Sequence, residues 1–172
     1  MKDKLTLVSL GVIAATLLGL GVIVRAKGAI LLTAPDAELR LASRFGSGVV
    51  VPSGVQPVAA AARVYRPALL TLTDRRDGAV WQLRSHGPWG RLAQVRVRAR
   101  QTCVVAAGPP LRIRPWVEIY PGLVQVTPCL LGRAGERYET SILKDGRQTS
   151  EPQVKIVDSA GTVLTSGRFQ YG

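Results

Sequence analysis

The first feature of the hydrophobic pattern is a long apolar run near the amino terminus. Residues 5–24 carry no charge, and charged residues flank the run on both sides. At about 1.5 Å per residue, a helix of this length reaches roughly 30 Å, the thickness of a bilayer hydrocarbon core. Secretory signal peptides have a shorter apolar region. The run therefore predicts a signal anchor that spans the membrane, with a cleaved signal peptide that ends near Ala26 as the alternative.

The tail before this run indicates where the rest of the chain lies. Lys2 and Lys4 precede the run and Arg25 and Lys27 follow it, so the positive-inside bias is nearly balanced. A very short amino-terminal tail normally stays in the cytoplasm, which directs residues 28–172 outward. We expect these residues to form one exported domain in the periplasm or on the cell surface. The domain is secreted if the signal peptide is cleaved.

Beyond the run, the pattern takes the two-residue period of β-strands. The clearest segment is 67–100, in which two strands flank a loop at 74–78 that ends in glycine. A third strand is predicted over residues 92–100, with Ala and Val on one face and Gln and Arg on the other. The pattern predicts a three-stranded meander with one dry side and one wet side.

The second half of the chain has the same character. Apolar and polar residues alternate over residues 111–119, and Pro115 restricts this strand to a sheet edge or a break. Pro121-Gly122 is a turn signal, and residues 154–166 form a terminal hairpin. Roughly nine to eleven short strands predict an all-β fold, an immunoglobulin-like or Greek-key β-sandwich preceded by one transmembrane helix.

The strand pattern resembles that of antibody-type domains only loosely. Such domains have a Trp between two Cys in sequence, and the Trp packs against the disulfide. Here Trp81 precedes both cysteines, which argues against a true immunoglobulin domain. The pattern divides the chain into three parts. Residues 1–27 are a signal anchor or signal peptide, residues 28–60 a partly irregular lead-in with short strands, and residues 61–172 the sandwich core.

Charge adds a candidate contact surface. The formal net charge is +12, and between Arg63 and Arg114 the chain has eleven arginines against only Asp74 and Asp77. Guanidinium groups bind phosphate and sulfate well, and exposed Trp and Arg are typical of protein interfaces. The candidate contact residues lie on predicted outer faces or in turns: Arg96, Arg98, Arg100, Arg112, Arg114, Trp116 and Trp89. A solvated outer sheet face is the simpler interpretation of the same arginines.

The residues with reactive side chains are few. Cys103 and Cys129 are the two cysteines, and in an oxidising compartment an even count favours one disulfide, with two small buried side chains as the alternative. Two cysteines and the single His86 do not supply a tetrahedral zinc site, and no cofactor is expected. Ser85 and His86 are adjacent, so in a strand they point to opposite faces and form no catalytic pair.

These observations favour a non-enzymatic, membrane-anchored envelope protein. We expect its exported domain to contact a protein partner, as an accessory subunit of a larger membrane assembly does. The alternative is a module that binds an anionic polymer, glycan or lipid face through its arginines, and an envelope hydrolase is the third hypothesis. Nucleic acid is not expected as a partner. Polyanion binding weakens steeply as salt rises, which distinguishes the first two hypotheses.

Overall fold

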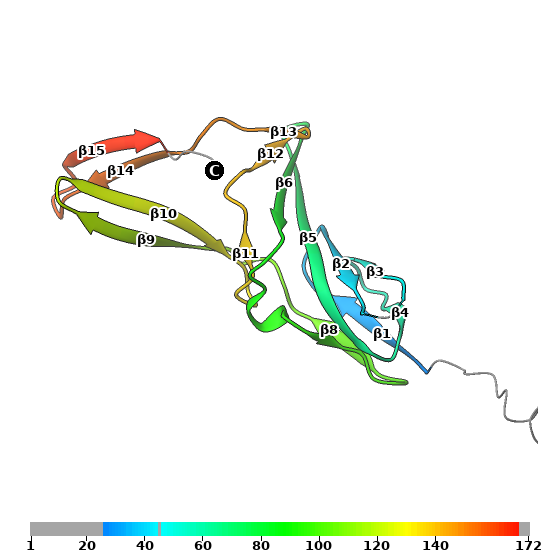
Figure 1. Ribbon diagram of the computed structural model, residues 1–172. Helices are drawn as coiled ribbons and strands as arrows, with labels where there is room; N and C mark the ends of the chain where they lie inside the picture. The colour runs from blue at the N-terminus through cyan, green and yellow to red at the C-terminus, as the bar shows by residue number, and fades with distance from the viewer. Residues whose placement is uncertain (1–25, 45, 169–172) are drawn as a thin grey trace, which may run out of the picture.

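The computed structural model describes residues 26–44 and 46–168, whose regular structure is almost all β-strand and forms four sheets (Figure 1). The all-β class predicted from the sequence is confirmed. The predicted anchor over residues 5–24 lies outside the described residues. Within the described part, no helix is long and apolar enough to cross a membrane.

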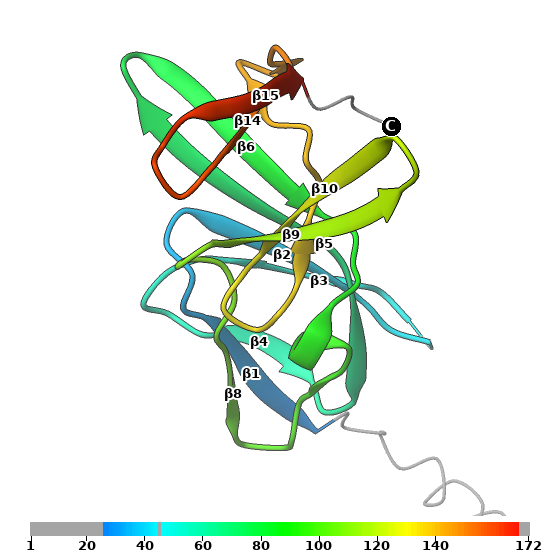
Figure 2. The ribbon, with the colours of Figure 1, turned by 90° about the vertical axis from the view of Figure 1, so that its left-hand side faces the viewer.

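The first of the two sheets around the main core has three strands in the order β4-β1-β8. Its strands are β1 (Lys27–Leu32), β4 (Val58–Ala61) and β8 (Thr102–Val105). β1 pairs antiparallel with β4 and parallel with β8. A strand from the start of the chain therefore lies beside one from its second half (Figure 2).

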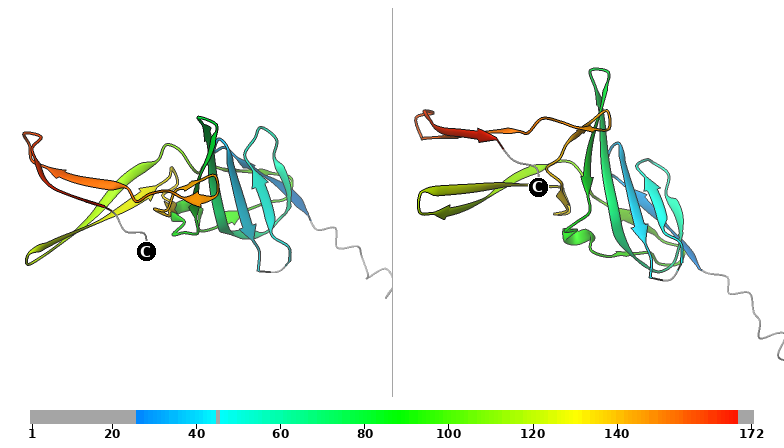
Figure 3. Two further views of the ribbon diagram at one scale, coloured as in Figure 1. Left: turned by 90° about the horizontal axis from the view of Figure 1, so that it is seen from above. Right: turned by 45° about the horizontal axis from the view of Figure 1, so that its top comes forward.

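The second sheet has seven strands, six in the order β13-β12-β6-β5-β2-β3 and β7 beside β5. Its strands are β2 (Ala37–Ala42), β3 (Val49–Pro52), β5 (Val64–Arg76), β6 (Ala79–Ser85), β7 (Val95–Arg96), β12 (Leu143–Lys144) and β13 (Arg147–Gln148). β5 has 13 residues and pairs with β2, β6 and β7. The joined end of β5 and β6 stands out beyond the other strands of the body (Figures 1 and 3).

Alternate residues of both sheets meet in one core. In β2, Ala37, Leu39 and Leu41 are buried and the residues between them are not. Ile30 and Leu32 of β1 belong to the same buried cluster and enter it from the other sheet. Burying one Leu or Ile side chain contributes about 1.5–3 kcal/mol. The packing of these two sheets is therefore a main source of stability.

Two details of the predicted meander are wrong. The turn between β5 and β6 has two residues, Asp77 and Gly78, both with positive φ, because the strands continue through most of the expected loop. The third strand, β7, covers only Val95–Arg96 and pairs with β5, not with β6. After β6 the chain forms the 3-10 helix η1 (Gly90–Leu92) and then returns beside the first residues of β5. The predicted alternation of buried and exposed residues holds over 95–98.

Residues 28–60 contribute short strands to both core sheets. This segment contains β2 and β3 and nearly all of β1 and β4. It also supplies fully buried core residues, among them Ile30 and Leu39. The segment is therefore an integral part of the two core sheets.

Two hairpins leave this body and project to the same side (Figures 1 and 3). The first pairs β9 (Arg112–Tyr120) with β10 (Leu123–Leu131), and the short β11 (Arg137–Tyr138) pairs with the base of β10. The second pairs β14 (Gln153–Val157) with β15 (Val163–Arg168). The terminal hairpin and the edge position of the strand with Pro115 agree with the sequence prediction.

Candidate partner-binding surfaces

One face of the β9–β10 hairpin is apolar along its whole length. In the antiparallel register, Val117 lies opposite Val126 and Ile119 opposite Val124, so each pair shares a face. By the same alternation, eight residues form what we call the apolar hairpin face: Ile113, Pro115, Val117, Ile119, Val124, Val126, Pro128 and Leu130.

Much of the apolar hairpin face is open to solvent. Ile113 is 74% exposed, Val117 51% and Ile119 78%. Single exposed apolar residues are common on soluble proteins, whereas a contiguous apolar patch of a few hundred Å² is often a contact site. Nine residues at about 3.3 Å each and two strands about 4.8 Å apart give a face of roughly 30 by 10 Å, or about 300 Å². This face is the first candidate surface.

The apolar hairpin face leads into a pocket of about 630 Å³ at the base of the hairpin. Leu111 lines the pocket, lies one residue before β9 and is in phase with Ile113. The wall consists mainly of apolar residues, with acidic residues around them: Leu72, Trp81, Leu83, Leu111 and Ile142, with Asp36, Asp74 and Asp77. Pocket and hairpin therefore form one continuous apolar track.

Glu136, which sequence analysis did not single out, ties the base of the hairpin to the body. Its side chain is fully buried. Oε1 accepts hydrogen bonds from the N–H of Gly108 over 2.6 Å and the hydroxyl of Tyr138 over 3.1 Å. Oε2 accepts one from the N–H of Ala134 over 2.9 Å. Gly108 precedes β9 and Ala134 follows β10, so one carboxylate holds both ends of the hairpin.

The same carboxylate affects the ionisation of Tyr138. Burial, and then the neighbouring Glu136, raise the pKa of Tyr138 far above its usual range. The unfolded chain releases this proton near pH 10, whereas the folded protein retains it. We expect the free energy of unfolding to fall as pH rises above about 10, by about 1.4 kcal/mol per pH unit from this group. Urea unfolding above and below that pH should show that the free energy of unfolding declines less steeply with pH for Tyr138→Phe than for wild type. Equal slopes would contradict the assignment of this decline to Tyr138.

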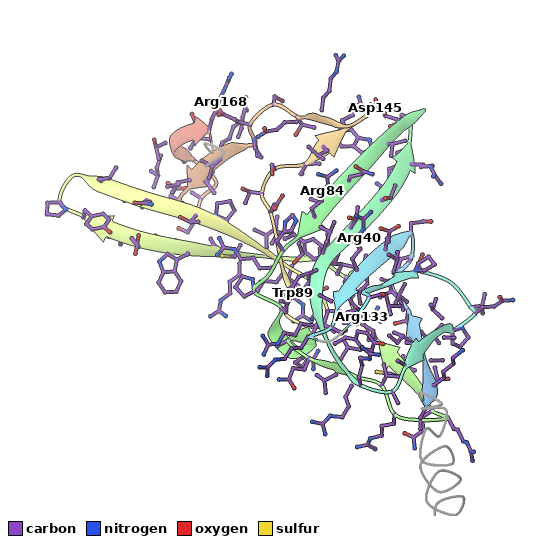
Figure 4. The ribbon with its side chains drawn as sticks, turned by 45° about the vertical axis from the view of Figure 1, so that its right-hand side comes forward. Arg40, Arg84, Trp89, Arg133, Asp145 and Arg168 are labelled. Carbon is purple, nitrogen blue, oxygen red and sulfur yellow. The ribbon has the colours of Figure 1, made fainter. Side chains whose placement is uncertain are left out.

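The predicted contact residues of β9 lie on the other face of the hairpin. Arg112, Arg114 and Trp116 alternate with the apolar residues, and the Trp116 side chain is 63% exposed. Trp89 differs, because it is half-buried and packs against the core cluster (Figure 4). In this structure Trp89 is partly covered by the core, and Trp116 is presented to solvent.

The other predicted arginines lie far from the hairpin. Arg96 belongs to β7, and Arg98 and Arg100 follow it in the loop before β8. The backbone N–H of Arg100 donates to the carbonyl oxygen of Lys27 over 2.8 Å, so this loop lies against the start of β1. The start of β1 and the hairpins are at opposite ends of the molecule (Figure 1). The structure does not bring the two arginine groups onto one surface.

Both cysteines are free thiols in the structure. Cys103 is in β8 of the core sheet and Cys129 is in β10 of the projecting hairpin, so the two belong to different sheets. Cys103 is half-buried, and burial raises the pKa of its thiol. The disulfide expected from the sequence is not formed here, and that pairing stays a prediction.

Ser85 and His86 have separate partners. The buried Ser85 hydroxyl donates to the carbonyl oxygen of Arg137 over 2.6 Å. The exposed His86 ring contacts the Glu139 carboxylate, with 2.6 Å between Nδ1 and Oε1. The serine hydroxyl is thus engaged with the backbone, and the two side chains do not form a nucleophile–base pair.

No known protein family matches this chain, and no curated protein or solved structure shows significant similarity to it.

Proposed function

We propose that this chain is a non-enzymatic, membrane-anchored envelope protein whose exported domain, an immunoglobulin-like β-sandwich, binds another protein. The anchor is residues 5–24, whose length and lack of charge suit a bilayer span. The binding surface is the apolar hairpin face together with the pocket at its base. The protein acts as an accessory subunit of a larger membrane assembly.

The continuity of the apolar surface carries this proposal. From Leu111 in the pocket wall to Ile119 near the hairpin tip, every second residue is apolar. An extended segment of a partner can lie along this track and place one side chain in the pocket. A buried anchor of that kind supplies much of the energy of a protein interface.

Face packing suits this surface better than strand addition. Pro115 lies in β9, the edge strand of its sheet, and lacks a backbone donor for an added strand. Sheets packed face to face lie about 10 Å apart, a distance that Val and Ile side chains fill. The partner is therefore expected to present its own apolar side chains to the hairpin.

The size of the face favours a different subunit over a second copy of this chain. A stable complex of two proteins buries about 800 Å² on each partner. The hairpin face offers roughly 300 Å², so a dimer formed through it alone would be weak. A different subunit that fills both the face and the pocket buries more.

A double variant tests the binding surface. Ile113→Ser with Ile119→Ser replaces the two isoleucines of the hairpin face, which are 74% and 78% exposed, and leaves the core sheets unchanged. We expect the protein that co-purifies with the full chain from detergent-solubilised membranes to decrease at least about tenfold, because two anchor contacts are lost. Quantitative mass spectrometry of the purified complexes measures this loss.

The matched control is Val55→Ser with Val104→Ser. These residues are 95% and 60% exposed but lie on the body, away from the hairpin. The control should keep the partner, and circular dichroism should show that both variants fold. A hairpin variant that folds and retains its partner would exclude this face as the binding surface. Loss of the partner from both variants would mean that the partner binds exposed apolar residues nonspecifically.

A further inference from the structure

Positive charge collects at the end of the molecule where the described chain begins. Lys27, Arg96, Arg98 and Arg100 are all exposed there, and we call these four residues the basic end. Backbone contacts hold the group together. Arg100 donates its N–H to the Lys27 carbonyl oxygen over 2.8 Å, and Gly28 packs against the carbonyl oxygen of Arg98.

Among the residues that the structure describes, no carboxylate neutralises the basic end. The chain has no Asp or Glu between Glu38 and Asp74, and none between Asp77 and Glu118. Across the described ranges 26–44 and 46–168, the three arginines of the basic end form no ion pair. Each exposed guanidinium carries five N–H donors that can bind an external anion.

The acidic residues of the body lie at its other end. β5 runs for roughly 40 Å from the basic end, where it pairs with β7, to its turn with β6. Asp36, Asp74 and Asp77 line the pocket near that turn. At that end Arg75 and Arg76 lie beside these carboxylates, and Arg76 pairs with Asp74 over 2.6 Å. The charges near the turn are therefore balanced, whereas the positive charge of the basic end is not, and a charged surface can orient the body.

We propose that the basic end contacts the phosphate groups of anionic phospholipids, in the membrane that residues 5–24 enter. This inference rests on the anchor in the proposed function. Lys27 is three residues after the apolar run, so a spanning run places it within about 10 Å of the lipid headgroups. Basic residues within a Debye length of an anionic membrane are attracted to it, and the guanidinium fork matches phosphate oxygens.

The location of the basic end favours lipid over a soluble polyanion. Arg98 and Arg100 lie beside Gly28 and Lys27, the first strand residues after the apolar run, so a bilayer that holds the run lies close to these arginines. Contact there places the start of β1 towards the membrane. The apolar hairpin face, at the opposite end (Figure 1), then points towards other proteins.

Chemical protection of the arginines tests this contact in the full chain. The protein is inserted into nanodiscs of phosphatidylcholine alone, or of phosphatidylcholine and phosphatidylglycerol in a two-to-one ratio. The rate at which phenylglyoxal modifies each arginine is read by peptide mass spectrometry. Arg75, exposed in β5 close to its turn with β6, is the internal reference.

On the anionic discs we expect Arg98 and Arg100 to react at least about threefold more slowly than on the neutral discs, with Arg75 unchanged. High salt should remove the difference, because the contact is electrostatic. Equal rates on both discs, for a chain that still floats with them, would overturn the lipid contact and leave the anchor intact. Equal protection of Arg75 would also overturn the lipid contact, because it would show that the domain adsorbs to the anionic discs nonspecifically. A chain that does not float with either disc would overturn the anchor and the lipid contact together.

Discussion

Glu136→Gln is expected to destabilise the protein by about 2–5 kcal/mol. The wild-type carboxylate accepts hydrogen bonds from Gly108, Tyr138 and Ala134 in a fully buried site. Glutamine has one accepting oxygen, so its amide N–H₂ must face a backbone N–H donor. Hydrogen bonds to a charged group contribute about 1.5–3 kcal/mol, and an unpaired buried donor costs about 1–3 kcal/mol. This is a large part of the 5–15 kcal/mol that stabilises an ordinary domain.

The matched control is Glu139→Gln. It makes the same chemical change three positions along the chain, but the Glu139 side chain is 43% exposed and its partner His86 is exposed as well. Exposed pairs contribute about 0–1 kcal/mol. Urea unfolding of both variants separates the two cases. If the free energy of unfolding of Glu136→Gln lies within about 0.5 kcal/mol of that of wild type, the carboxylate does not hold the hairpin base.

Gly28→Ala is the second substitution expected to have a large effect, about 3 kcal/mol or more. An added Cβ would collide with the carbonyl oxygen of Arg98 and lie 2.9 Å from that of Gln101. These are backbone atoms, and they cannot move aside as the end of a side chain can. The N–H of Ala29 donates to Gln101 over 2.9 Å and holds the loop in place. The variant must therefore displace this loop from β1.

Gly54→Ala provides the comparison. A Cβ at Gly54 meets no heavy atom within 4 Å. Alanine there restricts the unfolded chain, so the change should be neutral or stabilise the protein by up to about 1 kcal/mol. Thermal unfolding of the two variants measures the difference. A Gly28→Ala protein as stable as Gly54→Ala would show that the loop before β8 can move away from β1 without loss of stability.

Local turns were predictable from the sequence, whereas distant strand pairing was not. Pro121-Gly122 and the terminal hairpin follow from turn chemistry between nearby strands. The parallel pairing of Ile30 with Cys103 joins residues far apart in the chain. Strand period indicates which face is buried but not which strand is the neighbour. The same limit explains why β7 was expected beside β6.

The candidate site was predictable only in its residue pattern. The alternation from Ile113 to Ile119 is that of any strand with one buried face. Whether another sheet covers that face depends on packing between distant segments. The sequence therefore predicted the arginines of β9 as contact residues and did not single out the apolar face. Glu136 gave no signal at all, because most carboxylates are exposed and its donors come from residues as distant as Gly108.

The parallel pairing of β1 with β8 has a mechanical consequence. If the proposed function holds, a partner bound to the β9–β10 hairpin pulls on the carboxyl end of β8, and a membrane anchor pulls on the amino end of β1. In parallel strands these two forces oppose each other along the strand axis. The pairs from Ala29–Thr102 to Leu32–Val105 are then loaded together, in shear, and do not open one at a time. The domain would therefore resist tension between membrane and partner better than a strand pair that peels apart from one end.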